Sequence, residues 1–448
     1  MHAYDDPNIP VELGASIFVQ VNRILVNAAK EFNLSISAER STAAGPTIPG
    51  PSLAVWDGQS LVVTQEGENG WWDIAKLLWK YGLAPIKTIR LMRSTTAKFF
   101  KMYDEPVFPF CSLTQAVSDV GLLDVTASTG EQYMLEHGIT GSFAHDIVQA
   151  STRVNYAQNL KYIHGLEAMV CMATDGAMAI EGGNWKIFEQ MIVAANATTL
   201  LATGVSSVEK QDSGAYSIRF QPTAEVGDTA SKSQNFDAVI LAGPYQYANL
   251  SISPEPERLP DKVPYVQLHV TLFASPHLLS PVFFGLPQTE PAPKVILTTL
   301  PPGEDAGEGA AGCGSPGFFS ISLLDPVINP TTGNQEYLYK IFSPSPPNST
   351  FLANLLGLEH PHHRSGTGIT DEDITWMYRK VWNSYPYEFP RVTFDDLQLD
   401  ENLWYTSGME SFISTMETSA LMGKNVARLV VDQWRGKLAN GSKGGGVR

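Results

Sequence analysis

The chain has 448 residues, which is enough for two or three packed domains at roughly 150 residues per domain. Hydrophobic residues make up 43% and aromatic residues 10% of it, so collagen-like and wholly disordered classes are excluded. Acidic residues outnumber basic ones by 46 to 30, and the net charge of −16 would repel a phosphate backbone, so we expect no nucleic-acid partner.

The first 203 residues are expected to be mainly helical. A short apolar segment at 11–19 precedes a helix whose apolar residues repeat with a 3.6-residue period. From 70 to 103, aromatic side chains alternate with lysines and arginines, which predicts two amphipathic helices separated at 82–85. Residues 111–203 are predicted to be mostly helical, with an interruption at 174–183.

Strand signals dominate from about 204 to 345. Runs of β-branched and apolar residues predict strands at 205–208, 216–220, 238–242, 265–273, 295–300 and 318–324. The Pro-, Gly- and acid-rich stretch at 301–316 and the shorter one at 343–349 are expected to be loops. A helix is predicted at about 371–382. It is followed by a strand ending at 404–406, a long terminal helix, and a tail from Gly436 that is expected to fray.

The segment 403–434 carries the clearest signal for a ligand site. A strand-like run leads through Gly408 into the terminal helix, for which Ser414-x-x-Glu417 predicts a capping box. The start of that helix would present free N–H groups to a pyrophosphate or a ring oxygen, and Gly408 would permit close approach. One face of the helix is expected to be buried: Ala420, Gly423, Ala427, Val430, Val431 and Trp434.

Membrane spans and metal sites are not expected. No stretch approaches the ~20 uncharged apolar residues that a spanning helix needs, and the first ten residues lack a signal-peptide pattern, so the mature chain is expected to be soluble or peripheral. Three widely spaced cysteines allow at most one disulfide. The histidines at 360–364 lack the spacing and the carboxylate of a metal site, so a solvated loop is predicted there.

Glycosylation sequences bear on the cellular compartment. The Asn-x-Ser/Thr pattern mildly favours a secretory, vacuolar or lysosomal route, and it occurs at Asn33, Asn196, Asn249, Asn348 and Asn440.

Several motifs occur in order along the chain. They are Val-Glu-Leu-Gly-Ala-Ser at 11–16, Arg-Val-Asn-Tyr-Ala-Gln at 153–158, Ala-Ile-Glu-Gly-Gly-Asn at 179–184, Val-Ile-Leu-Ala-Gly-Pro at 239–244, and Gly-Met-Glu with Met-Glu-Thr-Ser-Ala at 408–410 and 416–420. With them the chain resembles the prenylcysteine oxidases, also called prenylcysteine lyases, over nearly its whole length. The second and third motifs are fairly specific to that family, whereas the last is shared with amine-oxidase-like flavoproteins.

The resemblance implies a fold of mixed α/β and α+β class, an FAD/NAD(P)-binding, amine-oxidase-like fold with an interleaved substrate domain of helices and an antiparallel sheet. It implies a remnant of the FAD-binding domain at 1–69, a helical substrate or membrane-facing region at 70–175, and an FAD-binding segment at 176–250. A substrate domain at 251–400, a closing FAD segment at 401–436 and a flexible tail at 437–448 would follow.

The resemblance also implies FAD as the cofactor and assigns residues to it. The first motif would lie along the flavin through Glu12, Gly14, Ala15 and Ser16. The backbone of Val205 would meet the adenine. The closing FAD site would be formed by Gly408, Met409, Glu410, Met416 and Glu417.

One departure from the family pattern concerns the N-terminus. Family members begin with a βαβ unit that carries Gly-x-Gly-x-x-Gly, followed by an acidic residue for the ribose. This chain opens without either. We therefore expect either an N-terminally truncated gene product or a reduced FAD cradle, and weak FAD binding by the chain as it stands.

The implied reaction is oxidative cleavage of a farnesyl- or geranylgeranylcysteine thioether, with dioxygen as the final acceptor, in the breakdown of prenylated proteins. Loss of hydride from the allylic carbon gives a cation that water attacks, and cysteine, a prenyl aldehyde and hydrogen peroxide result. The protein's part is placement, so no general base is named. The pocket candidates are Asn155, Tyr156 and His164.

Two other functions stay open. One is an amine-oxidase-like flavoenzyme with another substrate, and the other is a non-catalytic isoprenoid-binding remnant. In addition, segment 70–103 combines seven basic residues with exposed aromatic character, so peripheral contact with anionic lipid is an alternative to ordinary packing of two helices.

Overall fold

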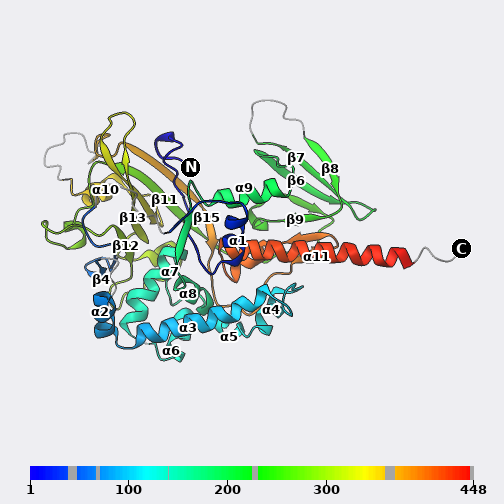
Figure 1. Ribbon diagram of the computed structural model, residues 1–448, viewed down its shortest axis with the longest axis horizontal. Helices are drawn as coiled ribbons and strands as arrows, with labels where there is room; N and C mark the ends of the chain where they lie inside the picture. The colour runs from blue at the N-terminus through cyan, green and yellow to red at the C-terminus, as the bar shows by residue number, and fades with distance from the viewer. Residues whose placement is uncertain (39–47, 67–70, 140, 224–230, 359–368, 444–448) are drawn as a thin grey trace.

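The computed structural model describes residues 1–38, 48–66, 71–139, 141–223, 231–358 and 369–443. A large sheet with its helical layer forms one half of the molecule, and three small sheets with the long C-terminal helix form the other (Figure 1). Among the described residues, no helix is both long enough and apolar enough to cross a bilayer. The three cysteines are free thiols.

The large sheet has seven strands in the order β15-β11-β14-β13-β12-β3-β4. Its neighbouring strands are antiparallel except β12 and β3, which run parallel. Segment 53–65 thus lies in the same sheet as strands from 265–386. The strands are β3 Leu53–Trp56, β4 Leu61–Gln65, β11 Tyr265–Ser275, β12 Val295–Thr298, β13 Ser320–Ile328, β14 Gln335–Ser343 and β15 Trp376–Pro386.

Helices cover the β12 end of this sheet from below in Figure 1. The helices are α2 Trp71–Tyr81, α3 Ala84–Phe99, η2 Phe100–Tyr103, α4 Leu113–Asp119, α5 Leu123–Ala127, α6 Gly130–Glu136, a π-helical turn η3 Ala144–Val148, α7 Gln149–Tyr156 and α8 Gly165–Cys171. Their core joins Met102, Leu166 and Phe412 among others, so apolar burial fastens the helical layer to the start of the C-terminal helix. The two helices expected in segment 70–103, parted at 82–85, are confirmed as α2 and α3.

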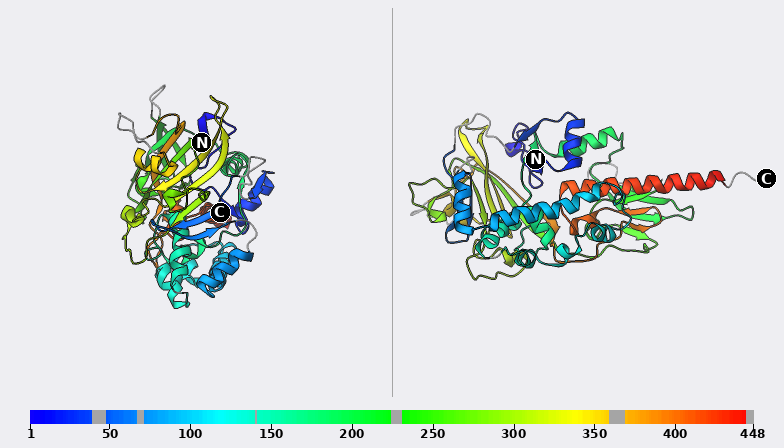
Figure 2. Two further views of the ribbon diagram at one scale, coloured as in Figure 1. Left: turned by 90° about the vertical axis from the view of Figure 1, so that its left-hand side faces the viewer. Right: turned by 60° about the horizontal axis from the view of Figure 1, so that its bottom comes forward.

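The other half holds three small sheets, in the orders β1-β5-β2, β10-β6-β7-β8 and β16-β17-β9. Figure 2 shows the C-terminal helix α11 starting in the middle of the molecule and running out along this half. The elements are β1 Phe18–Val19, α1 Arg23–Glu31, β2 Ile36–Ala38, β5 Ala177–Ile180, α9 Trp185–Ala194, β6 Thr203–Lys210, β7 Tyr216–Pro222, β8 Lys232–Phe236, β9 Val239–Leu241, β10 Ser251–Ser253, β16 Gln398–Asp400, β17 Leu403–Tyr405 and α11 Met416–Lys443.

Short helical elements complete the described chain. They are η1 Ala3–Asp5, η4 Tyr245–Tyr247, η5 Val282–Phe284, η6 Gly309–Cys313, η7 Ser407–Ser411 and α10 Ser349–Leu356. Helix α10 packs Leu352 and Leu355 against one face of the large sheet, and the N-terminal segment packs Ala3 and Val11 against the other. The six strands expected between 204 and 345 are confirmed, with β8, β10 and β14 in addition.

The helix expected at 371–382 is wrong, because most of this segment is strand β15, paired with β11. Trp376, Tyr378 and Trp382 alternate with more exposed neighbours and pack on the buried face of the sheet. This is the two-residue period of a half-buried strand. Lys380 interrupts that alternation in the sequence, which hides the signal.

Two expectations about α11 are also wrong. Its capping box is formed by Thr415 and Thr418, each of whose side-chain oxygens accepts the backbone N–H of the other, at 3.2 and 3.1 Å. Its buried face differs from the expected one, since Gly423, Ala427, Val431 and Trp434 are exposed and only Val430 of the expected residues is buried. The residues that face the core are Leu421, Met422, Asn425, Val426, Leu429 and Val430.

Glu417, which was expected to cap its own helix, instead caps α1. Its carboxylate accepts the N–H groups of Ile24 and Leu25 at 2.9 and 3.0 Å, and the hydroxyl of Tyr103 at 2.8 Å. The first N–H groups of a helix have no partner within it, so this carboxylate ties α1, η2 and α11 together.

The variant Glu417→Ala is expected to lower the free energy of unfolding by about 3 kcal/mol, because three donors, two of them buried, lose a charged acceptor. Tyr103→Phe removes one of the three bonds and is expected to cost about 1 kcal/mol. Urea denaturation at neutral pH measures both. Equal losses in the two variants would show that the contacts to α1 contribute nothing.

Candidate functional site

A hollow of about 170 Å³ lies at the start of α11. It is bordered by the β1–α1 segment 17–22, by Asn155 and Tyr156 at the end of α7, and by 413–418. The fold therefore brings two of the pocket candidates together with two residues of the expected FAD site, Met416 and Glu417.

The donors at this hollow are backbone groups. Helix geometry leaves the N–H groups of Met416 and Glu417 without an acceptor within α11, whereas the N–H of Thr418 is capped by Thr415. The positive end of the helix dipole lies at the same place. This arrangement suits an electron-rich carbonyl or a phosphate oxygen.

A second and larger pocket of about 540 Å³ adjoins the hollow. Its walls come from the sheet edge and the helical layer, and most are apolar: Leu53, Val55, Val63, Leu77, Trp79, Ile147, Met172 and Leu297 belong to them. Cys171 and Thr174 border both spaces. A volume of this size with mainly apolar walls is typical of a small-molecule site.

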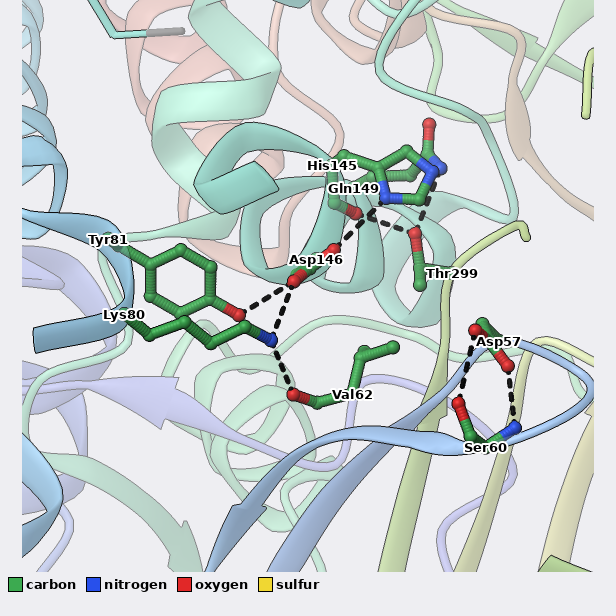
Figure 3. Close-up of polar contacts among 9 residues, drawn as sticks. All are labelled: Asp57, Ser60, Val62, Lys80, Tyr81, His145, Asp146, Gln149 and Thr299. Carbon is green, nitrogen blue, oxygen red and sulfur yellow. Dashed lines mark hydrogen bonds and ion pairs between the residues drawn. The ribbon is translucent and has the colours of Figure 1, made fainter. Parts of the chain in front are cut away.

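A polar network holds the rim of this apolar pocket (Figure 3). Lys80 donates to the carbonyl of Val62 at 2.7 Å and to the carboxylate of Asp146 at 3.0 Å. Tyr81 and His145 also contact Asp146, at 2.7 and 3.1 Å. Burial alone would raise the pKa of Asp146, but the hydrogen bonds from His145, Tyr81 and Lys80 outweigh it and lower the pKa.

The same network reaches the sheet. Thr299, after β12, donates to the carbonyl of His145 at 2.6 Å and accepts from Gln149 at 3.1 Å. Asp57 accepts the N–H of Ser60 at 2.7 Å and closes the turn between β3 and β4 (Figure 3). These bonds fix α2, the sheet edge and the start of α7 around the pocket.

His164, the third pocket candidate, lies away from the hollow. It is fully buried and caps α8, its Nδ1 accepting the N–H of Glu167 at 3.1 Å. Burial lowers the pKa of His164 to about 3, so the ring is neutral at physiological pH. The motif analysis missed Glu167 in this region. The sequence signal for it is a single acidic residue in an otherwise apolar helix, and its carboxylate has no hydrogen-bond partner within the part of the chain that the structure describes.

A third space, a cleft of about 860 Å³ with mixed polar and apolar walls, contains Glu12 and Ser16 of the expected flavin segment. Glu12 accepts the N–H of Asn184 at 2.7 Å, and the Asn184 side chain donates to the carbonyl of Ala15 at 2.8 Å. Gly182 and Gly183 have φ of 82° and 121°, values that favour glycine, and they line the same cleft. Segment 12–19 thus separates this cleft from the hollow.

The other expected FAD residues are packed against protein. Gly14 faces Trp382, and a Cβ on Gly408 would lie 2.9 Å from the Cβ of Asp395. Met409 is fully buried in the helical core. The remaining two expected FAD residues, Glu410 and Val205, differ in exposure.

Glu410 accepts the hydroxyl of Tyr265 at 2.9 Å, and burial raises its pKa. Val205 lies on β6 with 38% of its surface exposed. Neither residue borders the hollow or the apolar pocket.

A flavin fits the hollow in part. The free N–H groups of Met416 and Glu417 match its ring oxygens in chemistry, and the neighbouring cleft offers glycine backbone at 182–183 to the polar arm. The sequence pattern Gly-x-Gly-x-x-Gly does occur, in overlapping copies at 307–317, but there it forms the loop between β12 and β13. Gly312 in that loop accepts from Arg153, so the pattern is structural here.

Four of the glycosylation candidates are exposed: Asn33, Asn196, Asn249 and Asn348. Asn348 also caps α10 by accepting the N–H of Phe351 at 2.8 Å. The side chain of Asn440 and the histidines at 360–364 lie outside the described residues. Among the described residues no cluster of three metal-ligating side chains is present.

The comparisons with known proteins bear on the whole chain. It is 25% identical to a farnesylcysteine lyase of Arabidopsis thaliana over 95% of this chain and 78% of that protein. It is also 25% identical to prenylcysteine oxidase 1 of Mus musculus, over 95% and 80% of the two chains.

Solved structures show the same fold. A cyclohexylamine oxidase from Brevibacterium oxydans aligns with a TM-score of 0.51 at 11% identity over 97% of this chain and 90% of its own. A redesigned putrescine oxidase aligns with a TM-score of 0.52 at 10% identity, over 94% and 88%. The expected amine-oxidase-like, FAD-binding fold is confirmed. The prenylcysteine lyase family model matches residues 64–441, and the chain belongs to that family.

Proposed function

We propose that the protein uses FAD to cleave the thioether of prenylcysteines, giving cysteine, a prenyl aldehyde and hydrogen peroxide, in the breakdown of prenylated proteins. The observation that carries the proposal is the contact between two unlike spaces. An apolar pocket of about 540 Å³ adjoins a hollow that is lined by free helix N–H groups. Cys171 and Thr174 border both spaces. Such a pair suits a substrate with a long apolar tail and one reactive carbon.

The apolar pocket would hold the isoprenoid chain. Burial of hydrocarbon contributes about 0.8 kcal/mol per CH₂, so the tail supplies most of the affinity. The sulfur-bearing carbon would then lie near Cys171 and Thr174, at the junction of the two spaces.

The residues of this chain position the reaction. The flavin, when bound, accepts hydride from the allylic carbon, and dioxygen reoxidises it. The N–H groups of Met416 and Glu417 would bind the electron-rich edge of the ring, and the rim network of Lys80 and Asp146 would keep the pocket walls in place. The rest of the pocket excludes water from the isoprenoid chain.

The variant Val63→Trp tests where the isoprenoid binds. Val63 lines the apolar pocket from the edge strand β4, and a tryptophan there would fill part of it. We expect roughly a tenfold lower kcat/KM for farnesylcysteine, measured by peroxide formation.

The matched control is Val392→Trp. Val392 is 51% exposed and lines none of the three spaces described above, so its kcat/KM should match that of the unaltered protein. Oxidation of simple amines but not of farnesylcysteine by the FAD-loaded protein would instead establish an amine oxidase.

We further propose that the mouth of the apolar pocket contacts anionic lipid. Trp79 lines the pocket, yet 90% of its surface is exposed, and Lys76 beside it is exposed as well. Leu83, in the turn to α3, is 65% exposed. Exposed tryptophan with neighbouring lysine is typical of helices that lie at a membrane interface, where prenylcysteine would collect.

Liposome flotation tests the lipid contact. The protein is expected to float with vesicles that contain phosphatidylserine, and Trp79→Ala combined with Lys76→Glu should abolish flotation, since each basic residue contributes about 1 kcal/mol at such a surface. Trp434→Ala removes a comparably placed aromatic ring, 44% exposed, from α11 and should have no effect. Equal flotation of all variants would show that α2 does not contact lipid and only packs against the rest of the protein.

A further inference from the structure

A cluster of buried polar groups lies behind Tyr156. Several of its side-chain atoms have no hydrogen-bond partner among the described residues: Gln158 Nε2, His164 Nε2, both carboxylate oxygens of Glu167 and of Glu388, Ser384 Oγ, Tyr385 Oη and an Arg391 Nη. His164 and Glu167 are 0% exposed and Glu388 is 1% exposed. Buried polar groups are nearly always satisfied, so this cluster indicates bound water.

The backbone holds the two carboxylates on adjoining elements. Glu167 lies on α8, and Glu388 follows β15. The N–H of His164 donates to the carbonyl of Glu388 at 2.7 Å, and the N–H of Glu388 donates to Gln158 Oε1 at 3.1 Å.

The tautomer of His164 follows from its contacts. Its Nδ1 accepts a backbone N–H, so the ring proton of the neutral imidazole is on Nε2. That nitrogen faces Glu388 Oε2 at 3.5 Å, a separation that a small shift or a water can close.

The cluster adjoins the hollow through Tyr156. This tyrosine lines the hollow and donates its hydroxyl to the carbonyl of Ser414 at 3.0 Å. Its ring packs edge-on against Tyr385, with centroids 5.3 Å apart. Cys171 borders the hollow as well. Burial raises the pKa of its thiol, and the charges of Glu167 and Glu388 raise it further.

The proposed reaction requires a path for a proton at this place. Hydride loss to the flavin leaves a cation at the sulfur-bearing carbon. Water then forms a C–O bond there and must release one proton. The second water-derived hydrogen passes from the hemithioacetal oxygen to sulfur as the C–S bond breaks, which yields the aldehyde and the free thiol.

We propose that Glu167 and Glu388 form a hydrated proton relay that carries away the proton released by the attacking water, with Tyr156 at the boundary between the pair and the reacting carbon. The inference rests on the proposed oxidase function. Both glutamates act through water, so they are positioning residues and not groups that touch the substrate.

The electrostatics of the cluster agree with this role. Burial raises the pKa of Glu167 to about 8, and burial together with the charge of Glu167 raises that of Glu388. The charge of Arg391 opposes the shift of Glu388, whereas the charge of Glu410 adds to it. Both carboxyls therefore hold a proton at neutral pH, and each can pass a proton along by accepting at one oxygen while releasing from the other.

A first experiment needs no flavin and measures thermal stability against pH. Because the folded protein binds these protons more tightly than the unfolded chain, the stability they confer is full below their usual pKa of 4.5 and is lost as the pH rises through the raised values. Glu167→Gln and Glu388→Gln should each flatten this fall above pH 4.5. The exposed control Glu131→Gln should show the same fall in stability as the unaltered protein. If the fall also persisted in Glu167→Gln and Glu388→Gln, the pair would be ionised in the folded state and the proposal would be overturned.

A second experiment separates oxidation from hydrolysis in the FAD-loaded protein. With farnesylcysteine under anaerobic conditions, both glutamine variants should reduce the flavin within about twofold of the normal rate, because hydride loss precedes water attack. Aldehyde release in single turnover should be roughly a hundredfold slower in both, with a changed pH profile.

The two possible failures are distinguishable. Normal aldehyde release with an unchanged pH profile in both variants would overturn the role of the glutamates alone. Absence of flavin reduction by farnesylcysteine in the unaltered protein would overturn the proposed function.

Discussion

The arrangement of the candidate site depends on one buried cation, Arg153. Its side chain is 0% exposed and donates to Thr298 Oγ1 at 3.0 Å, to Asn159 Oδ1 at 2.7 Å, and to the carbonyls of Gly312 and Cys313 at 2.8 Å each. A buried charge is tolerated only when its donors are satisfied, so α7, β12 and the 307–317 loop must keep these positions. Helix α7 then places Asn155 and Tyr156 at the hollow, and the turn after it places Gln158 beside Glu388.

The two motifs most specific to the family both form long-range joints. The motif at 153–158 connects the helical layer to the sheet through Arg153 and to the start of α11 through Tyr156. The motif at 179–184 connects α9 to the N-terminal segment, because Asn184 bonds both Glu12 and Ala15. Each of these sets of contacts lies beside a cavity, so the motif residues hold the cavity walls in position.

Local patterns in the sequence were sufficient for much of the fold. The period of apolar residues predicted α2 and α3, and runs of β-branched and apolar residues predicted six strands, which are β6, β7, β9, β11, β12 and β13. The resemblance supplied the fold and the family. Strand β15 was missed because Lys380 breaks its alternation, and Glu417 was wrongly assigned to the cap of α11 because its partners in α1 lie 392 and 393 residues away. No local pattern encodes such a contact.

The candidate site itself could be predicted only in part. Asn155, Tyr156, Met416 and Glu417 border one hollow, but the walls of the apolar pocket come mainly from segments 53–65, 76–81 and 171–174, which lie outside the shared motifs. The glutamate pair depends on the approach of α8 to the end of β15. Both features follow from packing between distant segments, which the sequence alone does not reveal.

The chemistry proposed for the protein places opposite demands on its interior, and the fold separates them. The isoprenoid chain requires a dry apolar surface, whereas cleavage of the oxidised thioether requires water and a place for its proton. Tyr156 and Cys171 stand between the two environments, each with one side on the hollow and the other toward the buried glutamates. In the proposed mechanism, water bound by the glutamates would reach the reacting carbon past these two residues and not through the apolar pocket, because none of the residues that carry the unpartnered polar atoms lines that pocket.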